Sequence, residues 1–173
     1  MSLKHNSRFA SFTLIAKGNY PAEINLQIPF CLLVHEESEN CLKVMPGYWF
    51  LYNMYALARN SWKYVDRDRR TDKTQLIEYD FLAPDSIEEM FASLPLMEIA
   101  TAKAYKKQQD EGAENESMEE LRKLGKLILT EQPDVVSRLT ILLNGLENSK
   151  RPNQLIKLHR AYPVFINMIR LYG

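Results

Sequence analysis

Cysteine and glycine are both scarce in this chain, and their scarcity excludes several kinds of site. Only two cysteines occur among 173 residues, Cys31 and Cys41, so neither a disulfide framework nor a CxxC metal motif exists. We expect two reduced, buried thiols, although a hairpin between their strands would bring them close together. With six glycines in all, the nearest approach to a phosphate-binding turn is Lys17-Gly18-Asn19, which lacks the other glycines of such a loop.

A surplus of either charge is also missing. Lysine plus arginine and aspartate plus glutamate each number 22, so no overall field attracts nucleic acid or an anionic membrane. No uncharged apolar stretch reaches the roughly 18 residues that a membrane-spanning helix needs. The first residues contain no apolar segment of a secretory signal. We therefore expect no membrane partner, no nucleic-acid partner and a cytoplasmic location.

Histidines are few and scattered, which removes the usual metal motifs. His5, His35 and His159 have no second histidine or cysteine at helical spacing, and HExxH and EF-hand patterns are absent. The GxSxG motif is also absent. A Ser–His–acid triad stays open, because its members need not be adjacent in sequence. We expect no metal and no cofactor.

The first 45 residues are predicted to form a small β region. Apolar residues alternate strictly with others from Ile24 to Val34, which is typical of a half-buried strand. Cys41–Met45 is predicted to return beside it as a hairpin. A further β-type run covers Phe9–Ile15, closed by a turn at Gly18 and Pro21.

Residues 46–173 are predicted to be helical. The run 48–65 is apolar on every side, which is typical of a central, covered helix, and Arg59 and Asn60 interrupt it. Pro84-Asp85-Ser86 is predicted to start a helix with a side-chain cap, and Pro95 to kink or restart it. Thr74–Phe81 is weakly strand-like. Further helices are expected over 118–130 and from Pro133 to about Leu146, and a last one is expected to be capped by Asn153. The predicted class is α+β, mainly α, with about five helices in an irregular bundle.

An aromatic and basic face lies on the first of these helices. Its residues recur three or four positions apart and are Tyr48, Tyr52, Tyr55, Arg59 and Trp62. Such a face can stack bases or sugar rings while an arginine pairs with a phosphate. The alternative is a core helix whose tyrosine hydroxyls reach the surface, because aromatic stripes at helical spacing usually pack. Tyr52, Tyr55, Arg59 and Trp62 are the candidate ligand-binding residues.

The N-terminal half resembles a known family. The run His5-Asn6-Ser7-Arg8-Phe9-Ala10-Ser11-Phe12-Thr13-Leu14-Ile15-Ala16-Lys17-Gly18-Asn19-Tyr20-Pro21 resembles the last coil of a left-handed β-helix built from hexapeptide repeats. Ile24–Phe30 and the run 45–63 resemble bacterial hexapeptide-repeat proteins of unknown function, named by analogy as sugar-nucleotide pyrophosphorylases or acyltransferases. The similarity covers about residues 5–94. It implies a C-terminal helical region attached to a final coil, within a longer protein.

Two functions follow from this resemblance. In the first, the chain is a structural or interaction module whose helices cap the open end of a β-helix and support self-association or packing on it. In the second, it contributes substrate contacts to a sugar-nucleotide or acyl transferase. Hexapeptide acyltransferases commonly use a histidine base, which makes His5 the catalytic candidate. The chain holds at most about two coils of pattern, fewer than such enzymes stack. A third hypothesis, a nucleic-acid-binding helical domain, lacks both net charge and a recognition motif.

Overall fold

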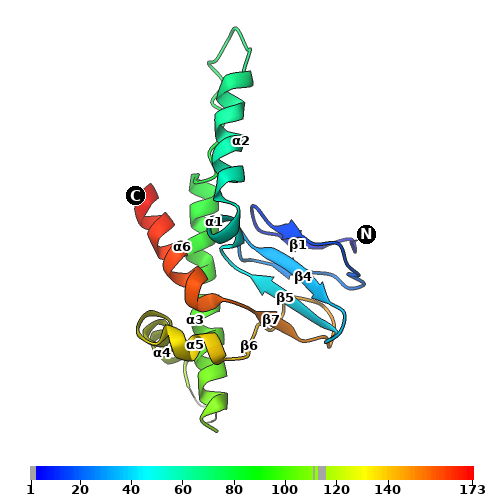
Figure 1. The fold of residues 1–173 in the computed structure, drawn as a ribbon, viewed down its shortest axis with the longest axis vertical. Coiled ribbons are helices and arrows are strands. Elements are labelled where there is room, and N and C mark those ends of the chain that lie inside the picture. Colours follow the sequence, from blue (N-terminus) through cyan, green and yellow to red (C-terminus); the bar gives the residue numbers. More distant parts are fainter. Residues whose placement is uncertain (1–2, 111, 113–115) are drawn as a thin grey trace.

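A computed structural model describes residues 3–110, 112 and 116–173 of the chain (Figure 1). It confirms the α+β class, with short strands first and helices after them. The strands are β1 (Arg8–Phe9), β2 (Leu14–Ile15), β3 (Asn25–Leu26), β4 (Leu32–Glu36), β5 (Cys41–Met45), β6 (Ile141–Leu142) and β7 (Asn153–Leu155). The helices are α1 (Tyr48–Tyr52), α2 (Met54–Arg67), α3 (Pro84–Gln108), α4 (Met118–Glu131), α5 (Pro133–Arg138) and α6 (Leu158–Tyr172). No helix in these described ranges has both the length and the apolar character to cross a bilayer.

Strands β1 to β4 wind as a coil, which we call the N-terminal coil (residues 8–33). β1 pairs in parallel with β3, and β2 pairs in parallel with β4. Arg8 lies opposite Asn25 and Leu14 opposite Leu32, so each partner follows 17 or 18 residues later. Parallel pairing needs a crossover connection, and here one turn of the coil supplies it. The coil is filled by buried side chains, the largest of which are Tyr20, Ile24, Leu26, Ile28, Phe30 and Leu33.

The prediction of one long strand from Ile24 to Val34 is wrong, because the chain forms two strands there, β3 and β4, with a corner between them. Phe30 has a φ of 52°, in the left-handed region, and the chain turns a corner there between β3 and β4. Residues at both odd-numbered and even-numbered positions, such as Cys31 and Phe30, are fully buried. The alternation of apolar residues therefore did not distinguish a buried face from an exposed face of one strand. The hairpin itself is real but shorter, with Leu32 paired to Met45 and Glu36 to Cys41. Both cysteines are free and buried.

The β layer also receives strands from late in the chain. The five-stranded sheet has the order β2-β4-β5-β7-β6, with β7 parallel to β5. The predicted helix from Pro133 therefore ends at Arg138, and the helix expected to be capped by Asn153 begins at Leu158 after β7. Leu155 faces the core at 2% exposure, because pairing with β5 and β6 buries this segment within the sheet.

Helix α3 is the long central element, and α4 and α6 lie against it (Figure 1). Its start at Pro84 is as predicted, but the cap differs. Ser86 Oγ accepts the N–H of Ala83 at 3.0 Å and donates to the carbonyl of Phe81 at 2.8 Å. The helix runs on through Pro95 without the predicted restart. The carbonyl that Pro95 leaves unbonded belongs to Phe91, a 55% exposed residue, where water can satisfy it.

Helix α2 projects from the rest of the molecule (Figure 1). The helix expected over 48–65 is broken at Asn53 rather than at Arg59 and Asn60. It is also not covered on all sides, since Leu57 is the one buried residue in α2. The chain returns along α2 without the strand expected over 74–81. We call α2 together with residues 68–82 the arm.

Candidate functional site

The outer edge of the N-terminal coil is formed by strands β1 and β2, each of which has one neighbour within the described sheets. The N–H groups of Arg8 and Ala10 donate to the carbonyls of Ile24 and Leu26 at 2.7 and 2.8 Å. Successive peptide groups of a strand point to opposite edges, so those of Phe9 point away from β3. Within the described sheets β1 has β3 as its one neighbour. The edge at Phe9 therefore has backbone donors and acceptors free for a further strand.

The second side of the coil repeats this arrangement. The N–H groups of Leu14 and Ala16 donate to the carbonyls of Cys31 and Leu33 at 2.8 and 2.9 Å, which turns the peptide groups of Ile15 outward. β2 has β4 as its one neighbour among the described strands. We define the open edge as Phe9, Phe12 and Ile15 with their peptide groups.

Aromatic stacking marks the corner of the coil. The ring of Phe12 lies on the ring of Phe30 with centroids 4.7 Å apart and planes 7° apart, yet Phe12 remains 40% exposed. Phe12 and Phe30 both have positive φ, and so does Asn6. These three positions differ by multiples of six residues.

Helices α1 and α3 hold the open edge in place. The indole N–H of Trp49 donates to the carbonyl of Phe12 at 2.7 Å, and the Ser11 N–H donates to Glu89 Oε2 at 2.7 Å. Thr13 Oγ1 donates to the carbonyl of Ala10 at 2.8 Å. The corner between β1 and β2 is therefore fixed by side chains rather than left to move.

The opposite edge of the coil is covered. β4 is paired along its length with the antiparallel strand β5. β3 is covered by the segment before β7, because Asn25 N–H donates to the Leu146 carbonyl at 2.7 Å and Asn148 N–H donates to the Glu23 carbonyl at 2.9 Å. The coil thus has one closed edge and one open edge.

A buried ion pair between Arg151 and Glu147 holds the segment 146–148 against the coil. Arg151 donates from Nε to Glu147 Oε2 at 2.9 Å and from a second nitrogen to Oε1, and it also contacts the Asn19 carbonyl at 3.4 Å. Burial opposes the charged form of Glu147, but hydrogen bonds from Arg151 and Ser149 outweigh it and hold the pKa of Glu147 below its usual range. The charge of His35 also acts on Glu147, and both ring nitrogens of His35 are buried without a hydrogen-bond partner among the described residues.

The predicted ligand-binding residues are divided by the structure. Tyr52 ends α1, and its hydroxyl accepts from Lys157 Nζ at 2.9 Å and from Arg160 at 3.0 Å. The hydrogen bond from Lys157 and the two positive charges lower the pKa of Tyr52. Lys157 also lies 4.9 Å from the ring centroid. Tyr52 is therefore held by hydrogen bonds and a cation–π contact from residues at the start of α6.

The other three residues lie on α2 and are exposed. Tyr55 is 77% and Trp62 is 64% accessible, and Arg59 lies between them on the same side of the helix. Tyr52, Tyr55, Arg59 and Trp62 line none of the four principal hollows of the described surface. The structure thus shows an exposed aromatic face and not a cavity.

His5 does not lie with these residues. It is exposed and precedes β1 in the chain, whereas Tyr55, Arg59 and Trp62 belong to α2, which projects from the rest of the molecule (Figure 1). No group of three potential metal-ligating side chains occurs in the described ranges. The catalytic role of His5 therefore stays a prediction.

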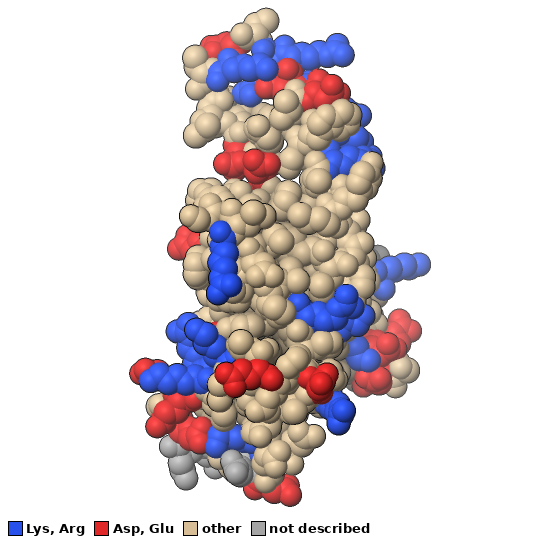
Figure 2. Space-filling view, turned by 60° about the vertical axis from the view of Figure 1, so that its left-hand side comes forward, with Lys and Arg blue, Asp and Glu red and all other residues tan. Residues whose placement is uncertain are grey.

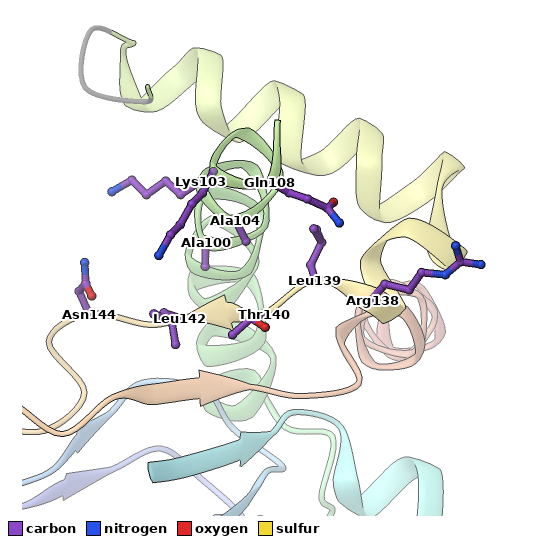
Figure 3. A pocket seen from close by; sticks show the side chains of 10 residues that line it. Ala100, Lys103, Ala104, Gln108, Arg138, Leu139, Thr140, Leu142 and Asn144 are labelled. Carbon is purple, nitrogen blue, oxygen red and sulfur yellow. The ribbon is translucent and has the colours of Figure 1, made fainter. Parts of the chain in front are cut away.

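A basic hollow of about 620 Å³ lies between α3 and the edge strand β6 (Figure 3). Lys103, Lys107 and Arg138 line it, together with Thr140 and Leu142. Sequence patterns did not predict this hollow, because its residues come from segments about 40 positions apart. The hollow offers the positive charge of three basic side chains. On the face seen in Figure 2 the two charge signs are mixed rather than segregated.

Comparison with known proteins finds a relative whose own function is uncharacterized. The chain is 37% identical over 171 residues to an uncharacterized protein of Treponema pallidum (strain Nichols). The match covers 99% of this chain and 22% of the relative, so the chain spans about a fifth of the length of the curated relative it matches. No family model matches the chain. No solved structure matches it either.

Proposed function

We propose that this chain is the C-terminal cap of a hexapeptide-repeat β-helix, a structural and interaction module. The observation that carries the proposal is the asymmetry of the N-terminal coil. Within the part of the chain that the structure describes, its outer edge leaves the peptide groups of Phe9 and Ile15 free, while β5 and the segment 146–148 cover the other edge. A β-helix grows by parallel stacking, so the antiparallel strand β5 ends growth in one direction and leaves the other available.

The repeat length supports the same proposal. Parallel partners 17 or 18 residues apart match a coil of about three hexapeptides. A preceding coil would place a strand against Phe9, another against Ile15 and a side chain on the exposed ring of Phe12. The helices then act as a support, because α1 and α3 fix the coil corner through Trp49 and Glu89. A cytoplasmic location belongs to this proposal.

A fusion protein tests the cap directly. A hexapeptide β-helix protein deprived of its own C-terminal segment is joined in register to residue 5 of this chain. We expect the fusion to be monodisperse in size-exclusion chromatography and to melt in one transition, whereas the uncapped host aggregates. A fusion that aggregates like the uncapped host contradicts the proposal.

Ile15→Pro is the informative variant for this fusion. Proline removes the outward N–H, which bonds to nothing within the described sheets, and so should leave the isolated chain folded by circular dichroism. In the fusion it removes a hydrogen bond of the new strand pair and should lower the melting temperature. Ile15→Val is the matched control, since it keeps both the N–H and the β-branched side chain.

The alternative, a substrate-binding part of a sugar-nucleotide or acyl transferase, is favoured by one observation. Tyr55 and Arg59 are exposed and follow Tyr52 closely in the chain. The Tyr52 hydroxyl accepts hydrogen bonds from the positively charged side chains of Lys157 and Arg160. This face offers aromatic rings and cations to an anionic sugar nucleotide. A thermal-shift titration with nucleoside diphosphate sugars and acyl-CoA tests it, because a ligand of the folded state raises the melting temperature. A flat response that Arg59→Ala does not alter would contradict the alternative.

A further inference from the structure

The basic hollow between α3 and β6 is bordered by an unpaired strand edge. β6 ends the five-stranded sheet and has β7 as its one neighbour among the described strands. The N–H of Leu143 donates to the carbonyl of Asn153 in β7 at 2.8 Å, so the peptide groups of Leu142, one residue earlier, point away from β7. Leu142 lines the hollow, as does Thr140 two residues before it. The edge of β6 that has no partner in the described sheets therefore faces this hollow (Figure 3).

Helix α3 gives the hollow a floor of small side chains. Ala100 and Ala104 lie one turn apart on α3, and both line the hollow. Figure 3 shows them between Lys103 on one side and Leu139 on the other. Because a methyl side chain is short, another backbone can approach the helix closely at these two positions. The hollow, about 620 Å³ in volume, therefore has room for a further strand alongside β6.

Positive charge in the hollow is not neutralised by the described part of the chain. Every ionisable residue that lines it is basic, namely Lys103, Lys107 and Arg138, and none of the three forms an ion pair with a described residue. Lys103 and Lys107 are one turn apart on α3, a spacing at which like charges repel. Figure 3 places Lys103 toward one end of β6 and Arg138 toward the other. An occupant with negative charges along its length would relieve this repulsion at both ends.

We propose that an acidic, extended segment of a partner protein binds in the basic hollow as a further strand on β6. Its backbone hydrogen-bonds to the outward peptide groups of Leu142, and its carboxylates pair with Lys103 and Lys107 at one end and with Arg138 at the other. A second copy of this chain is a poor occupant, because its own β6 edge carries the same three positive charges. A compact anion is also a poor fit, because it uses neither the strand edge nor both charged ends.

This inference is independent of the proposed cap. β2, which carries part of the open edge, and β6 stand at opposite ends of the order β2-β4-β5-β7-β6. A preceding coil on the open edge and a peptide on β6 therefore do not compete for the same surface. The inference is also separate from the transferase alternative, because none of Tyr55, Arg59 and Trp62 lines the hollow.

Fluorescence anisotropy of a labelled hexapeptide of alternating glutamate and threonine, with both ends blocked, tests strand addition. We expect saturable binding to the 173-residue chain that added salt weakens. The same peptide methylated on every backbone nitrogen keeps its charges but loses its N–H donors, and it should bind at least about tenfold more weakly. Absence of saturation up to about millimolar chain overturns the proposal, as does equal binding of the two peptides.

Charge reversal and a competing anion test the place and the kind of ligand. Lys103→Glu should weaken peptide binding at least about fivefold. Lys126→Glu is the matched control, since Lys126 is exposed on α4 and does not line the hollow, so the same change of net charge should have little effect. Equal losses in the two variants overturn the assignment to this hollow. Sodium triphosphate at an equal concentration of negative charge should not displace the peptide, and displacement would show a small-anion site instead.

The Leu142 amide reports directly on the new strand pair. In the free chain it should exchange quickly, and saturating acidic peptide should slow its exchange at least about tenfold. Leu142→Pro removes this N–H, which points away from β7, and so should keep the circular dichroism spectrum while weakening the peptide at least about fivefold. Leu142→Val is the matched control, since it keeps the N–H and should bind as the wild type does. Unchanged exchange of Leu142 in the presence of bound peptide overturns the proposal.

Discussion

Gly125 lies where α4 crosses α3, at a contact that admits no side chain. A Cβ atom placed on Gly125 would lie 1.8 Å from the carbonyl oxygen of Glu98. The Glu98 side chain, 2% exposed, accepts from Tyr162 Oη at 2.6 Å and from Arg122 Nε at 2.7 Å. Burial and the hydrogen bond to Glu98 raise the pKa of Tyr162, so it stays a neutral donor. One small residue and one buried carboxyl therefore join α3, α4 and α6.

Gly125→Ala should destabilise the chain by about 2 kcal/mol or more, because the helices must move apart to admit the methyl group. Urea unfolding at neutral pH measures the loss. Gly112→Ala is the control, since no atom of the described residues lies within 4 Å of its added Cβ and the change should be nearly neutral. Equal effects of the two variants would contradict the close crossing.

The Glu147–Arg151 ion pair should make the free energy of unfolding depend on pH in the acidic range. The folded pKa of Glu147 is lowered, so its contribution is fully present above the unfolded pKa of about 4.3. It is lost as the pH falls through the lower folded pKa. The urea midpoint of the wild type should therefore decline more steeply between about pH 5 and pH 2 than that of Glu147→Gln. Parallel declines would show that Glu147 is not ionised in this pair.

At the scale of single elements, α3 contains two prolines in different positions. Pro84 occupies the first turn, where its missing N–H is unneeded, whereas Pro95 lies within the helix. Pro95→Ala should stabilise the chain by about 1–3 kcal/mol by restoring a bond to the Phe91 carbonyl. Pro84→Ala should change stability little. Thermal unfolding of both variants measures the difference, and destabilisation by Pro95→Ala would contradict the account.

Element boundaries were predictable where the local signal was strong and single. The start of α3 at Pro84 and the amphipathic α4 agree with the sequence, because capping and helical periodicity act locally. Residues 24–34 were predicted as one long strand, but side chains of both alternating sets, such as Phe30 and Cys31, are buried, so the alternation did not distinguish a buried face from an exposed one. Polar segments around Asn153 gave no strand signal, since β7 forms only by pairing with β5.

At the scale of the whole molecule, the α+β class was predictable but the route of the chain was not. The chain leaves the β layer after β5, forms five helices through α5 within the described residues and returns as β6 and β7. Such long-range pairing has no local signature. The candidate residues Tyr55, Arg59 and Trp62 were found by their spacing, but only the structure shows them exposed on a projecting arm. The open edge emerges from pairing and is likewise invisible in the sequence.

Amide hydrogen exchange of the isolated chain and of the β-helix fusion tests the central claim most directly. In the isolated chain the amides of Phe9 and Ile15 should exchange quickly, while those of Ala10 and Ala16, which donate to Leu26 and Leu33, should be protected. In the fusion the amides of Phe9 and Ile15 should slow at least about a hundredfold as they bond to the preceding coil. Unchanged fast exchange in a folded fusion would contradict the claim that this edge receives a β-helix.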